Sequence, residues 1–465
     1  MQKSRLSGLV EHLKLTDGMR KVGSLALPMM FIPLFTNLMV FLDRVILGHY
    51  SIDAMNSVAA AASAISPLVF SAWSIATIAE VFVGQLCGAQ RYGKMAQPVW
   101  QMVWFSLFLG VIFLPIAIWA GPYILPQTFV KEGLPYYQLV MAAGFLTPLN
   151  TALASFFIGS GNVRVIAMSV GVGACVNCTL DLLLIFGIPG IFPSLGTLGA
   201  GIATIVASLT QTAILGILFS RSSLRMGHPP AWRICWHTLK DCITIGGPNA
   251  LSYLMEMTGW YLMFVIAAKM GQVHVTILQI GYSLYTLFSF LPEGLQKGVI
   301  ILTSNSVGRR HFSEIPQILG SSVKIHLLLM GILSVPFLIF PEQSIRIFLG
   351  SELSAEEMGL IITHGRLTLV WVWCALFCDE LGWIISGILT AAGDTRFVMK
   401  LSCISVSCFW MLPVFSFSLI LKDKPGALWG MMVCYGAMNF LLFFRRYKRG
   451  EWKNVQISSL ALTAA

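Results

Sequence analysis

Long apolar runs alternate with short polar breaks along the whole chain. Twelve of these runs are long enough to cross a lipid core of about 30 Å as a helix of roughly 20 residues. A segment inside lipid meets no water, so it must satisfy its own backbone groups by forming a helix. The expected fold is an all-α integral membrane protein with helices near residues 22–47, 57–86, 100–124, 136–160, 163–186, 198–220, 242–269, 275–306, 318–340, 358–391, 397–421 and 426–444.

Prolines lie inside several of the predicted helices. A proline removes one backbone donor and clashes with the preceding turn, so each position predicts a kink or a break. Neighbouring helices must then supply partners for the freed carbonyl groups. The positions are Pro28, Pro33, Pro67, Pro115, Pro148, Pro292, Pro336 and Pro413.

Short segments of the first half recur in order in the second half. The matches join 27–28 to 247–248 and 84–88 to 304–308, both at an offset of 220, and 159–164 to 391–396 at an offset of 232. Each half holds six helices, and because six is an even number both halves insert the same way round. The halves are then related by a pseudo-two-fold axis along the membrane normal. The predicted organisation is a bundle over 1–221, a linker over 222–241, a bundle over 242–444 and a basic tail over 445–465.

Composition supports a membrane protein and excludes two other classes. The chain has 465 residues, of which 56% are hydrophobic and 11% charged. A soluble domain carries about 25% charged residues. Disorder requires low hydrophobicity and high charge. The chain is therefore expected to be neither a soluble globule nor a disordered protein.

The formal net charge of +10 follows from the distribution of lysine and arginine along the chain. With the N-terminus placed inside, 22 of the 30 basic residues lie on the inner side and six on the outer side. By the positive-inside rule, both termini are cytoplasmic, and a bacterial inner membrane is expected. The charge indicates topology and weak attraction to anionic lipid, and it does not indicate a nucleic-acid partner.

Carboxylates within the predicted helices are the main functional candidates, because a charge there is costly and normally faces a cavity or a partner. They are Asp43, Glu80, Asp181, Glu256, Glu293, Asp379 and Glu380. Asn177 lies one turn before Asp181, so their side chains share one helix face.

Asp43, Asn177, Asp181 and Thr204 all belong to the first half. Together they would offer an oxygen cage that suits a hard cation such as Na⁺. Alternatively, the two acids would share a proton, since like charges held close together disfavour double ionisation. A third interpretation gives Asn177 and Thr204 only interhelical hydrogen bonds that support packing.

The second half contains a different set of candidates. Glu256 and Asp379 have Trp260, Tyr261, Trp371 and Trp373 near them in sequence, and an acid beside aromatic rings suits a lipophilic cation. Packing or interface anchoring is the alternative for each single ring. Glu293 and Lys297 are four residues apart on one helix, which favours an intramembrane ion pair.

Motifs that would indicate an enzyme or an ATP-driven pump are not found. The sequence holds no phosphate-binding P-loop, no zinc-protease motif and no nucleophile elbow. No catalytic role and no cofactor are therefore expected, and a membrane-embedded enzyme or structural protein lacks support.

The sequence resembles the MATE (multidrug and toxic compound extrusion) family over nearly its whole length. The matching segments are Ala26-Leu-Pro28 with 41–48, which holds Asp43; 83–89; 177–187 with 195–204, which hold Asn177, Asp181 and Thr204; and 387–395. The resemblance implies a drug/ion antiporter of two six-helix bundles. It also implies cation or proton coupling at the four residues of the first half, with Glu256 and Asp379 used in the second half by one branch of the family.

Two features depart from the family pattern. Glu293 and Lys297 stand where small uncharged residues are usual, and Asn305-Ser306-Val307 replaces a glutamine-rich helix end. The prediction is a monomeric antiporter of organic cations driven by Na⁺ or H⁺. The alternative is a lipid-linked precursor flippase of the same superfamily, for which Lys297 and Arg366 would provide part of a cationic cavity.

Overall fold

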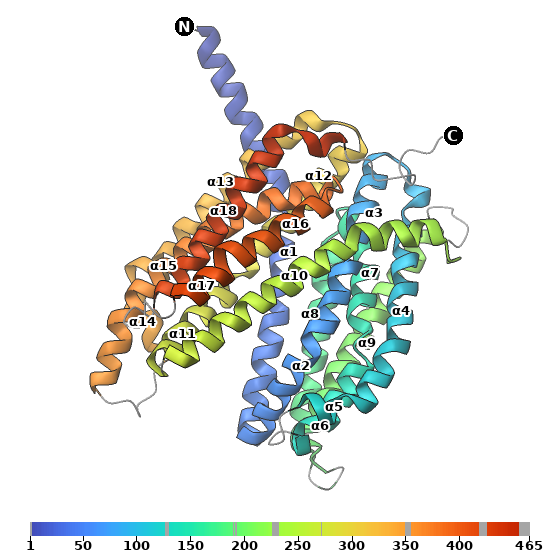
Figure 1. Cartoon of the computed structure of the whole chain (residues 1–465). Coiled ribbons are helices and arrows are strands. Elements are labelled where there is room, and N and C mark those ends of the chain that lie inside the picture. The colour runs from blue at the N-terminus through green and yellow to red at the C-terminus, as the bar shows by residue number, and fades with distance from the viewer. Residues whose placement is uncertain are drawn as a thin grey trace. The chain divides into compact units, whose positions relative to one another are not determined.

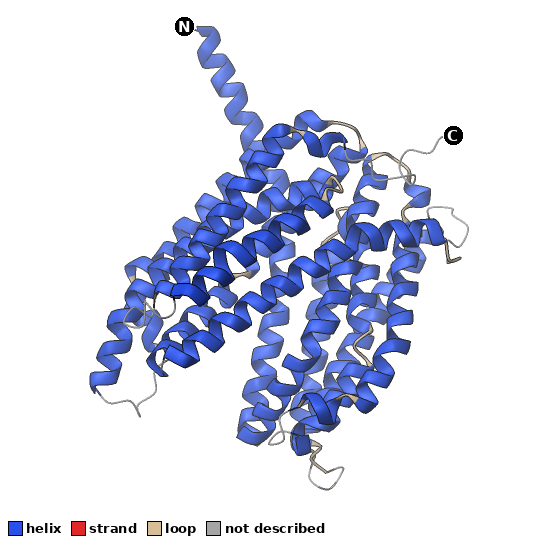
Figure 2. Cartoon of the chain, viewed as in Figure 1, coloured by secondary structure: helices blue, strands red, loops and turns tan. Residues whose placement is uncertain are grey.

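Helices account for every element in the computed structural model (Figure 2). The structure describes residues 2–125, 130–188, 190, 193–225, 232–270, 272–348, 355–417 and 426–454. Within these residues, twelve helical stretches are long and apolar enough to cross a membrane, which confirms the all-α membrane fold and the number of spans. The stretches run from Gly18–Tyr50 at the first span to Leu428–Arg449 at the last.

Several spans are built from more than one helix (Figure 1). The longer helices are α1 (Gln2–Tyr50), α2 (Ile52–Ala76), α3 (Ile78–Gly88), α4 (Ala96–Trp119), α6 (Val130–Ala142), α7 (Leu146–Gly159), α8 (Arg164–Phe186), α9 (Gly196–Arg225), α10 (Trp236–Met270), α11 (Gln272–Phe288), α12 (Phe290–Gly308), α13 (Ile315–Ser334), α15 (Ala355–Ala391), α16 (Thr395–Ser405) and α18 (Ala427–Arg449). The short helices are α5 (Gly121–Ile124), α14 (Pro341–Arg346) and α17 (Leu412–Phe417).

The described residues form two compact units. The N-terminal unit comprises 31–250 and 304–310, and the C-terminal unit comprises 2–30, 251–303 and 311–454. Each unit has its own apolar core, with α2, α6 and α9 contributing to the first and α10, α11, α15 and α18 to the second. Helix α1 contributes residues to both units.

Two of the predicted prolines coincide with breaks in the spans. Pro148 is the third residue of α7, directly after the break between α6 and α7. Pro292 is the third residue of α12, directly after the break at Ser289. A proline has no N–H for the carbonyl four residues earlier, so the preceding helix ends there. Pro336 lies in a π-helical turn, whereas Pro67 and Pro115 lie inside continuous helices.

The repeat-related segments 84–88 and 304–308 lie against each other in the N-terminal unit. A Cβ added to Gly88 would lie 2.0 Å from the backbone oxygen of Asn305, and one added to Gly308 would lie 2.0 Å from that of Gln85. Gly88 and Gly308 are related by the repeat offset of 220, and so are Gln85 and Asn305, so each glycine meets the repeat equivalent of the other glycine's partner. This reciprocity is the pattern that a two-fold axis between the two segments produces.

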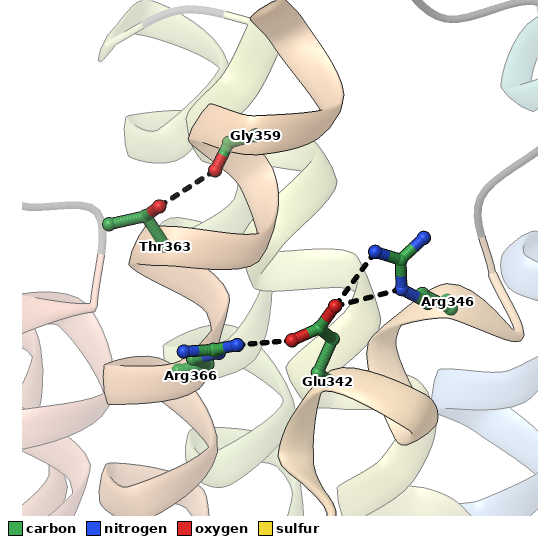
Figure 3. Close-up of polar contacts among 5 residues, drawn as sticks. All are labelled: Glu342, Arg346, Gly359, Thr363 and Arg366. Carbon is green, nitrogen blue, oxygen red and sulfur yellow. Dashed lines mark hydrogen bonds and ion pairs between the residues drawn. The ribbon is translucent and has the colours of Figure 1, made fainter. Parts of the chain in front are cut away.

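A charged cluster joins α14 to α15 in the C-terminal unit (Figure 3). Glu342 accepts hydrogen bonds from Arg346 Nε and Nη2 at 3.0 and 2.7 Å, and its other oxygen accepts one from Arg366 Nη2. The Arg366 side chain is 56% exposed. The hydrogen bonds from the two arginines hold the pKa of the Glu342 carboxyl below its ordinary value. Arg366 is therefore an exposed side chain that pairs with Glu342, rather than part of a buried cationic cavity.

We expect Glu342→Gln to lower thermal stability at pH 7, because the neutral amide attracts the two arginines only weakly. The effect should be small, since both arginine side chains are exposed. A carboxyl whose pKa is lowered by folding stabilises the protein above the ordinary glutamate pKa of about 4.3. That stabilisation disappears as the pH falls further through the lowered value. Unfolding curves of the wild type and the variant should therefore differ at pH 7 and converge in acid. Glu356→Gln, an exposed acid in α15, is the control. Identical curves at pH 7 would contradict the prediction.

Candidate functional site

Two carboxyl groups meet inside the N-terminal unit. Asp43 is carried by α1, and Asp181 by α8. Their side chains lie within hydrogen-bonding reach of each other, and Asp181 feels the charge of Asp43. Asp181 and Asn177 are fully buried, while Asp43 is partly buried. The structure thus brings together two acids that are far apart in sequence.

Several polar atoms of these two acids and of Asn177 have no hydrogen-bond partner among the described residues. Asp43 Oδ1, both oxygens of Asp181 and both amide atoms of Asn177 are buried without a hydrogen-bond partner among the described residues. Leaving such atoms unpaired is costly, so native structures satisfy nearly all of them. Two ionised carboxylates cannot donate to each other, whereas a proton or a cation between them would satisfy several oxygens together. Among the described residues, Asn177 also makes no interhelical hydrogen bond that would give it a packing role.

Close packing of α8 and α9 positions these residues. A Cβ on Gly199 would lie 2.8 Å from the carbonyl group of Leu184, so only glycine permits this approach. Thr204 lies farther along α9, where its hydroxyl donates to the Ala200 carbonyl at 2.9 Å. That bond leaves the lone pairs of the Thr204 oxygen available to another group.

Tyr136 is a member of the site that the sequence analysis missed. It is buried on α6, close to the charges of Asp43 and Asp181, and its hydroxyl is within hydrogen-bonding reach of Thr204. No spacing rule links it to the other residues, because it lies about 45 positions before Asp181 and on another helix. Its sequence context, Tyr136-Tyr137 near a helix start, is also typical of aromatic anchoring at the membrane interface.

Acids also lie close together in the C-terminal unit. Tyr285 of α11 donates a hydrogen bond from its hydroxyl to Asp379 Oδ2 at 2.9 Å. Glu256 of α10 is close enough to Asp379 for their charges to interact. Gly436 of α18 permits the contact with α15, since a Cβ there would lie 3.0 Å from the Asp379 nitrogen. The two acids predicted for this half are therefore neighbours.

A group of aromatic rings is joined to these acids through Tyr285, which bonds to Asp379. Trp260 is the centre of the group, with ring centroids 4.9 Å from Tyr282, 5.4 Å from Tyr285, 5.1 Å from Trp410 and 5.6 Å from Trp429. Four of the five rings are buried, and Tyr282 is partly buried.

The other aromatic candidates in this half lie apart from that group. Tyr261 is 71% exposed, and Trp371 is also exposed. Trp373 stacks on Phe377 and donates to the Met330 carbonyl. Only Trp260, of the four predicted aromatics, therefore belongs to the ring group beside the acids.

Glu293 and Lys297 lie one turn apart on α12, both partly buried. The charge of Glu293 is felt by Tyr253 of α10, which also feels Glu256. Glu293 therefore belongs to the neighbourhood of the second acidic set. The predicted Glu293–Lys297 ion pair stays a prediction.

Each acidic set can bind positive charge, but with different chemistry. The first offers several buried oxygens that have no hydrogen-bond partner among the described residues, which suits a proton or a small hard cation. The second combines acids with π faces, which suits an organic cation. No group of three or more His, Cys, Asp or Glu side chains able to hold a metal occurs in the described part of the chain, so a transition-metal centre has no support there.

Similarity to known proteins agrees with this fold. The model of the MatE family matches residues 28–183 and 248–414. Together these two matches cover most of the predicted spans of both halves.

Curated relatives agree with the family match, and a solved structure agrees with the fold. The chain is 25% identical over 456 residues to the probable multidrug resistance protein NorM of Thermotoga maritima, covering 93% of each protein. It is 27% identical to that of Bradyrhizobium diazoefficiens, covering 85% of each. Among solved structures, a MATE protein in the straight conformation matches with a TM-score of 0.83, 16% identity and coverage of 94% of this chain and 97% of that one.

Proposed function

Because the chain belongs to the MatE family of multidrug efflux transporters, we propose that it is a secondary antiporter that exports organic cations in exchange for Na⁺ or H⁺. It is an integral multi-pass membrane protein and not an enzyme. The observation that carries the proposal is the Asp43–Asp181 pair, in which three of the four carboxyl oxygens are buried without a partner among the described residues.

Coupling follows from differential binding. A coupling ion that binds one of the inward- and outward-facing states more tightly shifts the population toward that state, whereas equal affinity shifts nothing. In this proposal the ion or proton binds between Asp43 and Asp181, with Asn177, Thr204 and Tyr136 around it. The organic cation binds near Glu256 and Asp379 in the C-terminal unit and favours the opposite state.

The proposed orientation places both termini in the cytoplasm of a bacterial cell, with the protein in the inner membrane as a monomer. The 22 basic residues of the inner segments support this orientation. Organic cations would then leave the cell as the coupling ion enters down its gradient.

Dye efflux from vesicles tests the proposal. Purified protein is reconstituted, a fluorescent cationic dye is loaded, and Na⁺ and pH gradients are imposed separately. We expect dye export to accelerate with at least one gradient and to stop when both are dissipated. Export that is independent of both gradients would contradict the antiport mechanism. Vesicles without protein provide the background.

The Asn177 side chain distinguishes the two coupling ions. We expect Asn177→Ala to raise the Na⁺ concentration for half-maximal export by about tenfold, because it removes one of the oxygen ligands that set cation affinity. Proton-driven export requires only the carboxyl groups and should keep its rate. Ser169→Ala is a matched control, since Ser169 is buried on the same helix and its hydroxyl donates within that helix to the Ile166 carbonyl. An unchanged Na⁺ response in Asn177→Ala would contradict a Na⁺ site.

The flippase alternative is not favoured. The relatives found are multidrug resistance proteins. Of the two basic residues that pointed to a cationic cavity, Arg366 is paired with Glu342, and Lys297 lies in an environment that also holds Glu293.

A further inference from the structure

A histidine and a glutamate form a buried pair outside the sets described above. His326 lies on α13 and Glu380 on α15, and their side chains are 0% and 3% exposed. The His326 Nδ1 atom lies 2.6 Å from Glu380 Oε2, and the His326 Nε2 atom lies 3.1 Å from the backbone oxygen of Phe377. Both ring nitrogens therefore face oxygen atoms.

These contacts determine how many protons the pair holds. The Phe377 oxygen can only accept, so Nε2 must carry a hydrogen. A bare Nδ1 lone pair and an ionised carboxylate would repel each other at 2.6 Å, so a second hydrogen must lie between Nδ1 and Oε2. With that proton on either atom, the pair has no net charge, because it is imidazolium with carboxylate or imidazole with carboxylic acid.

The surrounding contacts hold the two helices in this arrangement. His326 of α13 donates to the Phe377 carbonyl of α15, while Trp373 of α15 donates to the Met330 carbonyl of α13 at 3.2 Å. The Phe377 ring also packs on the His326 ring, with centroids 5.2 Å apart. The ring of His326 therefore has little freedom to leave Glu380.

The pair is coupled to the acidic set of the C-terminal unit. Glu380 directly follows Asp379 on α15, and Asp379 feels its charge. The other oxygen of Glu380, Oε1, has no hydrogen-bond partner among the described residues, so His326 supplies the hydrogen bond that this carboxyl receives there.

We propose that His326 and Glu380 together hold one proton inside the C-terminal unit and thereby remove the charge of Glu380 beside Asp379. His326 is thus a positioning residue, because it acts on the cation site through Glu380. Part of the proposal rests on the proposed function, since it assumes that Asp379 serves a transported cation. The protonation of the pair itself does not depend on transport.

Spectroscopy tests the protonation. The full chain, labelled with ¹⁵N-histidine and placed in lipid nanodiscs, is compared with His326→Leu and Glu380→Gln at pH 7.5. We expect either a ring with both nitrogens protonated, which should be absent from both variants, or a protonated carboxyl band in the infrared spectrum, which should be absent from Glu380→Gln. Absence of both signals from the wild type would overturn the proposal, whatever the transport activity.

A rescue experiment tests the role in transport. His326→Leu leaves Glu380 buried without its partner, and removing one member of a buried pair is far more disruptive than removing both. We expect export turnover to fall by about tenfold in His326→Leu and to recover to within about twofold of the wild type in His326→Leu/Glu380→Gln. Export is normalised to the amount of folded protein, so that a loss of stability alone does not lower it. A double variant that exports no better than His326→Leu would overturn charge removal as the function. If the wild type exports no cation while the spectroscopic signal is present, the proposed function fails and the proton-holding pair stands.

Discussion

Asp43→Asn is expected to reduce ion-driven export to the level of protein-free vesicles, while the protein still folds and inserts. The amide has nearly the same shape as the carboxyl, but it cannot bind a proton at neutral pH and carries no charge for a cation. Without an ion that distinguishes the two facing states, the gradient cannot shift their populations. Asp181→Asn is expected to give the same result, because the two carboxyls form one site.

The measurement is dye export from proteoliposomes under separately imposed Na⁺ and pH gradients, normalised to the amount of folded protein. Asp53→Asn is the matched control, since Asp53 is an exposed acid in the first turn of α2. We expect the control to transport like the wild type. Wild-type export by either site variant would contradict the assignment of the coupling site.

Binding of the cationic dye provides a second measurement on the same variants. If Asp43→Asn removes only the coupling, the variant should still bind the cationic dye at the second acidic set. Dye binding in detergent should therefore stay within about twofold of the wild type, because the two sets lie in different units. Loss of dye binding together with loss of export would place the dye in the N-terminal unit.

The membrane spans could be predicted from sequence because lipid imposes a strong and local rule. A segment that crosses the bilayer must be apolar and helical, so hydropathy alone reveals it. The ends of the helices were less predictable. Helix α1 begins at Gln2, within a polar stretch that has no hydropathy signal, and the break at Thr77 has no proline next to it. Such features depend on contacts that a hydropathy pattern does not contain.

The site was predictable only in part, for a related reason. Charge inside a span identified Asp43 and Asp181, and helical spacing added Asn177. Neither rule applies to Tyr136, an uncharged residue near a helix end, or to His326, whose partner lies 54 positions away on another helix. Only the fold shows that such residues meet.

The repeat provided information of another kind. It predicted that 84–88 and 304–308 are equivalent, and the structure places them in contact. We expect Gly88→Ala to lower the free energy of unfolding by about 1–3 kcal/mol, the usual cost of overpacking. The new Cβ would lie 2.0 Å from the Asn305 oxygen, so the segments would have to move apart by about 1 Å, and the obstacle is backbone rather than a flexible side chain.

Gly331→Ala is the control for this prediction. It lies inside α13, and a Cβ there meets nothing within 4 Å, so the change should be neutral or slightly stabilising through helix propensity. Thermal unfolding of the purified chain in detergent compares the variants. Gly308→Ala should match Gly88→Ala, since each glycine meets the backbone of the other segment. The double variant should cost less than the sum, because one shift of the segments relieves both contacts. Equal midpoints for Gly88→Ala and Gly331→Ala would show that the two segments do not pack this closely.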